Sequence, residues 1–107
     1  MNKEKQIIAI AKACGFSEIR SIIMPTHSAL SGKRKGKNEW IADYTSDLNA
    51  MHKAEEYMWE NGGYVVDEYQ NNLSSLCGGR AFKYCHAPAH KRAESFLKAF
   101  GLWEEEL

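Results

Sequence analysis

The stretch PAHKRAESFLKAFG, residues 88–101, carries the clearest structural signal in the chain. Its apolar residues recur every three or four positions, which places them on one face of an α-helix. They are Ala89, Ala93, Phe96, Leu97 and Phe100. Pro88 suits the first turn of a helix, and Gly101 suits the left-handed position after the last turn. The stretch therefore predicts a helix whose apolar face is buried.

A second helix is predicted at the start of the chain. Residues 3–14 place Ile7, Ile10, Ala11 and Cys14 on one helical face. Asn2 is positioned to cap the first turn, and Gly15 is positioned to end the helix.

Two stretches between these ends also show helical spacing. The run from Leu48 to Trp59 follows Thr45 and Ser46, either of which suits the N-cap, with Asp47 in the first turn. Residues 66–77 repeat the helical spacing. However, the preceding residues 64–66 are β-prone, so the pattern leaves the type of that element open.

Three short segments favour strands. Residues 19–24 are rich in β-branched side chains and stop at Pro25, and residues 40–42 suit a second strand. Residues 81–85 alternate small or polar side chains with aromatic ones, as a half-buried strand does. Together with the helices, they predict an α+β fold, a small sheet with helices packed on it.

Residues 32–38, GKRKGKN, separate the first two predicted strands. Four cations and two glycines within seven residues suggest no regular element, so a mobile loop or a hairpin tip is predicted. We expect a single domain over residues 1–107, with a flexible basic loop near residues 31–38.

Composition narrows the class of protein. The formal net charge is zero, with 14 basic and 14 acidic residues, which argues against a general DNA-coating protein. The three cysteines are an odd number without tight spacing, as in reduced cytoplasmic proteins. No apolar run approaches membrane-spanning length. We therefore expect a cytoplasmic protein that has no contact with a membrane.

Two segments together resemble the phage ABA sandwich domain family of bacteriophage and prophage proteins. They are DYTSDLNAMH at residues 43–52, and HAPAHKRAESFL at residues 86–97 with Gly101-Leu102-Trp103 after it. The resemblance implies an α–β–α layered sandwich and the cytoplasm of an infected bacterial cell, and it carries no catalytic residues.

One corner of the predicted fold combines aromatic and basic side chains with the start of the last helix. Aromatic rings stack on bases, while cations and a helix N-terminus attract phosphate. The expected ligand-binding residues are Trp40, Tyr44, Arg80, Lys83, His86, His90 and Arg92. The alternative is that the aromatic rings belong to the core and the cations face solvent.

The basic segment offers a second candidate site. Lys33, Arg34, Lys35 and Lys37 suit non-specific contacts with the phosphates of a nucleic acid. The alternative is a solvated loop that binds nothing.

No metal, cofactor or catalytic centre is expected. Cys77, Cys85, His86 and His90 lie close together, but without the paired spacing of a zinc site. No local signature supports a catalytic Cys or Ser.

We therefore expect a phage accessory binding protein that sequesters a nucleotide-type signal of host defence, and that assembles as a homo-oligomer. The alternative is a nucleic-acid or protein interaction module used in phage replication or host takeover.

Overall fold

The computed structural model describes residues 1–23, 25, 28–61, 65–76 and 87–105. Four helices and one three-stranded antiparallel sheet make up the described fold. In chain order they are α1 (Lys3–Ala13), β1 (Ser17–Ile23), β2 (Ser28–Arg34), β3 (Lys37–Ile41), α2 (Leu48–Asn61), α3 (Val65–Leu76) and α5 (Ala89–Ala99). The predicted α+β class, a small sheet with helices packed on it, is confirmed. The predicted strand over residues 81–85 lies outside the described residues.

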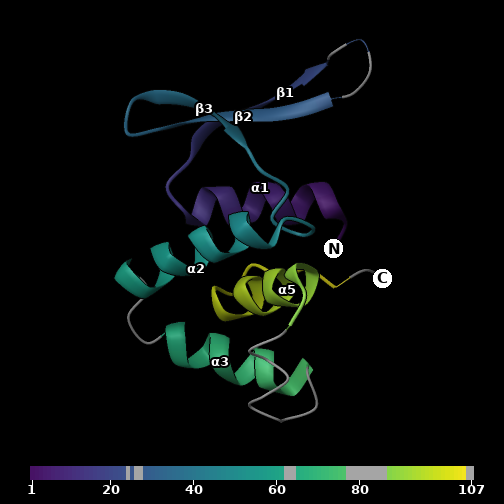
Figure 1. The fold of residues 1–107 in the computed structure, drawn as a ribbon, viewed down its shortest axis with the longest axis vertical. Coiled ribbons are helices and arrows are strands. Elements are labelled where there is room, and N and C mark those ends of the chain that lie inside the picture. The colour runs from purple at the N-terminus through teal and green to yellow at the C-terminus, as the bar shows by residue number, and fades with distance from the viewer. Residues whose placement is uncertain (24, 26–27, 62–64, 77–86, 106–107) are drawn as a thin grey trace.

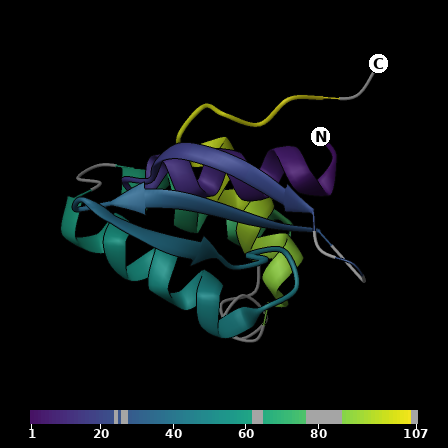
Figure 2. The ribbon, with the colours of Figure 1, turned by 90° about the horizontal axis from the view of Figure 1, so that it is seen from above.

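All four described helices lie on the same side of the sheet (Figure 1). The sheet forms the top layer, α1 and α2 lie beneath it, and α5 and α3 lie further below. Figure 2 looks down on the sheet, and the helices are all behind it. The order of layers therefore differs from the α–β–α arrangement that the family resemblance implies. We call the side of the sheet that faces away from these helices the outer face.

The helix α1 forms with the predicted caps. The side chain of Asn2 accepts a hydrogen bond of 2.8 Å from the Lys5 amide. At the other end Gly15 adopts a φ of 94°, and the Phe16 amide donates to the Ala11 carbonyl at 3.0 Å. This left-handed ending turns the chain so that Phe16 is buried under the sheet.

The basic segment forms the tip of a hairpin, which is one of its two predicted forms, and most of residues 31–38 lie in strands and not in a loop. Pairing between β2 and β3 continues to Arg34 and Lys37, and only Lys35 and Gly36 form the turn. Both turn residues have positive φ, 54° and 77°, as a two-residue hairpin of type I′ requires. Gly32 lies inside β2, where a Cβ atom would come within 3.2 Å of Ile41. That glycine allows close packing and does not interrupt the strand.

The residue that caps α2 lies one to two positions later than predicted. The Asp47 carboxylate accepts from the Ala50 amide at 3.2 Å, so Asp47 occupies the capping position. Thr45 and Ser46 instead donate their hydroxyls to the Asp43 carboxylate, each at 2.6 Å. These bonds form a tight turn between β3 and α2.

The core lies mainly among the helices. The largest fully buried side chains include Ile10 of α1, Met51 and Met58 of α2, and Phe96 and Leu97 of α5. Packing on this core resolves the open assignment, because α3 is helical from Val65 onward despite its β-branched start.

Candidate functional site

The predicted ligand corner is not assembled around Arg92. This side chain is buried, and its Nη1 donates to Glu55 Oε2 at 3.0 Å while its Nε donates to the Ala87 carbonyl at 2.9 Å. His90 is exposed in the first turn of α5. Arg80, Lys83 and His86 lie outside the described residues. A ligand of this corner would therefore have to compete with Glu55 for Arg92.

Glu55 is the centre of a polar cluster that joins α2, α3 and α5. Besides Arg92, it accepts the Tyr69 hydroxyl at 2.8 Å and contacts His52 Nδ1 at 3.0 Å. Burial, and then the neighbouring Glu55 charge, raise the pKa of Tyr69 far above its ordinary value. The role of Glu55 was missed from the sequence. Its only signal there is a carboxylate on the apolar face of a predicted helix.

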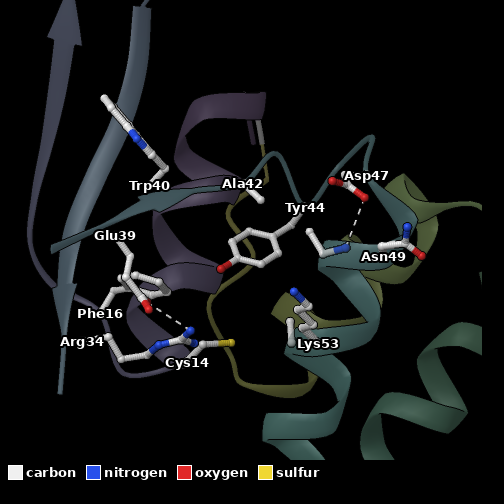
Figure 3. A pocket seen from close by; sticks show the side chains of 12 residues that line it. Cys14, Phe16, Arg34, Glu39, Trp40, Ala42, Tyr44, Asp47, Asn49 and Lys53 are labelled. Carbon is white, nitrogen blue, oxygen red and sulfur yellow. Dashed lines mark hydrogen bonds and ion pairs between the residues drawn. The ribbon is translucent and has the colours of Figure 1, made fainter. Parts of the chain in front are cut away.

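Trp40 and Tyr44 lie on opposite sides of the sheet. Figure 3 shows the Trp40 ring on one side of β3 and the Tyr44 ring on the other, under the sheet. Tyr44 is only 6% exposed, as the core alternative expects, whereas Trp40 is 60% exposed and is not part of the core. The two rings therefore do not form one stacking surface.

Trp40 belongs to a row of residues across the outer face. The strand register aligns Arg20 of β1 with Ser31 of β2, and Ser31 with Trp40 of β3. Side chains directly opposite one another on neighbouring strands share a face of the sheet. Ile41, the next residue of β3, is buried on the helix side, which agrees with Trp40 facing outward. In this row the exposed Trp40 indole and the exposed Arg20 guanidinium lie on either side of the small Ser31 side chain.

The hairpin that carries Trp40 is strongly basic. Between Ser28 and Ile41 it contains one carboxylate, Glu39, and four cations, Lys33, Arg34, Lys35 and Lys37. Lys33 pairs with Glu18 at 3.0 Å and Arg34 pairs with Glu39 at 3.2 Å. Lys35 and Lys37 are exposed and form no ion pair with any residue that the structure describes. The register therefore places Lys33 on the outer face with Trp40, whereas Arg34 and Lys37 pair on the helix side, where Arg34 stacks on Phe16.

No metal or nucleophilic centre emerges from the described part of the chain. Burial raises the pKa of the Cys14 thiol to about 11, so the reactive thiolate is scarce at neutral pH. Among the described residues, no three His, Cys, Asp or Glu side chains are grouped as metal ligands would be. Cys77, Cys85 and His86 lie outside the described residues, so the expectation of no zinc stays a prediction.

Comparisons of the chain with protein-family models, with curated proteins and with solved structures gave no match. The resemblance to the phage family therefore stays a prediction. No helix within the described ranges has both the length and the apolar character needed to cross a bilayer.

Proposed function

We propose that this protein binds single-stranded nucleic acid on the outer face of its sheet, along the β2–β3 hairpin. One observation carries the proposal. Trp40, which is 60% exposed, shares the outer face of the hairpin with Lys33, and the exposed Lys35 lies in the turn at the end of the same hairpin. An aromatic ring beside a run of cations is the combination that holds a base and its flanking phosphates.

The physical chemistry of the two groups fits a single strand better than a duplex. An indole can stack on a base only when that base is unpaired and turned outward. Stacking of this kind contributes roughly 1–3 kcal/mol per base and tolerates any base. Lysine and arginine side chains contact phosphates, whose affinity for cations depends on salt. The expected binding is therefore salt-sensitive and largely independent of sequence.

Fluorescence anisotropy with a labelled oligothymidine tests the proposal. Replacing Trp40 by Ala should weaken binding roughly fivefold to hundredfold, the equivalent of one stacked base. Trp59 on α2 is 56% exposed and lies outside the hairpin, so Trp59→Ala is the matched control and should bind normally. Equal affinities of both variants and the wild type would overturn the proposal.

Salt dependence provides an independent measurement. The variant Lys35→Gln/Lys37→Gln removes two cations that have no ion-pair partner among the described residues. If each contacts one phosphate, the slope of log affinity against log salt should become shallower by about 1.4. An unchanged slope would place the phosphates elsewhere on the protein.

The narrower expectation of a phage protein that sequesters a nucleotide-type signal remains a separate prediction. Its predicted site includes Arg80, Lys83 and His86, which lie outside the described residues. Arg92 is buried against Glu55, so it could contact such a ligand only by leaving that carboxylate.

A further inference from the structure

A pocket lies beside β3, and both Trp40 and Tyr44 are among the residues that line it. Its walls are β3 and the start of α2, and its floor is formed by Cys14 and Phe16 at the end of α1 (Figure 3). The volume is about 460 Å³, within the range of sites for small organic ligands. A neighbouring groove of about 700 Å³ runs toward the hairpin tip and shares Arg34, Glu39 and Lys53 with it.

Arg34 is held in place at the edge of this pocket. Its guanidinium lies over the Phe16 ring, 4.5 Å from the centroid, and its Nη2 is 3.2 Å from Glu39 Oε2. A guanidinium has five N–H donors, and no other hydrogen bond joins the Arg34 side chain to the described residues. The stack and the ion pair therefore orient Arg34 while leaving donors for a ligand.

Lys53 supplies an ammonium group that is not paired with a carboxylate of the described pocket residues. It projects from α2 into the pocket, on the same side of β3 as Tyr44 (Figure 3). Two carboxylates line the pocket, but Glu39 pairs with Arg34, and Asp47 caps α2 through the Ala50 amide. Lys53 forms no ion pair with any described residue. The Lys53 ammonium is therefore available to an anionic group of a ligand.

Tyr44 adds a neutral donor. Its hydroxyl points toward the Arg34 side of the pocket (Figure 3), and burial raises the pKa of Tyr44 to about 12. The phenol therefore keeps its proton at neutral pH. A fork of N–H groups, an ammonium and a hydroxyl suit an anion with several oxygen atoms.

We infer that this pocket binds the phosphate group of a small phosphorylated molecule through Arg34, Lys53 and Tyr44. The volume leaves room for an organic part beside the phosphate. Trp40 and Arg34 line this pocket as well, so Lys53, which the proposed nucleic-acid site does not use, distinguishes the two sites.

Isothermal titration calorimetry with ADP and with pyrophosphate tests the inference. We expect saturable binding that Lys53→Gln weakens about tenfold, the usual size of a lost charged hydrogen bond. Lys12→Gln on α1 is the control, because Lys12 is an exposed lysine outside the pocket, and it should bind like the wild type.

Two results would overturn the inference. One is the absence of saturable binding of both probes, and the other is equal affinity of Lys53→Gln and the wild type. Tighter binding of ADP than of pyrophosphate would support contacts with the organic part. Equal affinity for the two probes, if sensitive to Lys53, would support a site that recognises phosphate alone.

Discussion

The arginine of the helical layer and the arginine of the β2–β3 hairpin differ in burial and in their partners. In the helical layer, Arg92 is buried, and it is bound by Glu55 and by the Ala87 carbonyl. On the hairpin, Arg34 is partly exposed and stacked on Phe16, and Lys35 and Lys37 extend into solvent. A buried cation needs partners from its own chain, because burial without them is costly. The comparison indicates that Arg92 stabilises the fold and that Lys35 and Lys37 of the hairpin remain available to a partner.

The largest effect is expected from the helical core. Phe96 is 0% exposed and packs 4.7 Å, between ring centroids, from Phe100. Replacing Phe96 by Ala should lower the free energy of unfolding by about 3–5 kcal/mol, because it removes a buried ring and leaves a cavity. Urea denaturation measures this change. A loss below 1 kcal/mol would mean that the ring is not part of the core.

Breaking the buried ion pair should cost slightly less. Arg92→Met leaves the Glu55 carboxylate buried with Tyr69 and His52 as its remaining partners. We expect a loss of about 3 kcal/mol in the free energy of unfolding. The double variant Glu55→Gln/Arg92→Met should be more stable than Arg92→Met alone, since it leaves no unpaired charge. If Arg92→Met were as stable as the wild type, the contrast between the two regions would fail.

A smaller effect should appear in acid, at the turn that connects the two regions. Burial alone would raise the pKa of Asp43, but hydrogen bonds from Lys3, Ser46 and Thr45 outweigh it and lower that pKa to about 2. The unfolded chain binds this proton near pH 3.9. The stabilisation is therefore present above about pH 4 and is lost as the pH falls toward 2.

The variant Asp43→Asn isolates this contribution. It should be less stable than the wild type at pH 5, by about 1 kcal/mol or less because the carboxylate is partly exposed. The difference should shrink by pH 2.5 in denaturation experiments. A constant difference across this range would show that Asp43 stabilises the turn through hydrogen bonds that do not depend on its charge.

The smallest change in stability is expected on the outer face. Trp40→Ala removes an exposed ring, so the free energy of unfolding should change by no more than about 0.5 kcal/mol. The same variant is expected to lose affinity for a single strand, as proposed above. Thermal melts beside the anisotropy measurements separate the two effects. A destabilisation as large as that of Phe96→Ala would make Trp40 a structural residue.

Much of the helical architecture follows from local patterns. The apolar spacing of residues 88–101 and 3–14 predicts α5 and α1, and both helices end at the expected glycines, with φ of 72° at Gly101 and 94° at Gly15. These features depend on neighbours within one or two turns, so the local sequence is enough to predict where the two helices form and end. The exact start of α2 was predicted less well, because Thr45, Ser46 and Asp47 all suit a cap. Asp43 accepts hydrogen bonds from the Thr45 and Ser46 hydroxyls, which leaves Asp47 to cap the helix.

The candidate site depended on contacts between distant parts of the chain. From the sequence alone, Arg92 and Arg34 are both cations next to other cations, and nothing local separates a buried one from an available one. Likewise, Trp40 and Tyr44 are aromatic residues four positions apart. The sequence by itself determined α1 and α5, the ends of these two helices and the basic character of residues 33–37. Tertiary structure decided that Glu55 buries Arg92 and that β3 separates Trp40 from Tyr44, because burial and facing depend on which residues, remote in sequence, pack alongside.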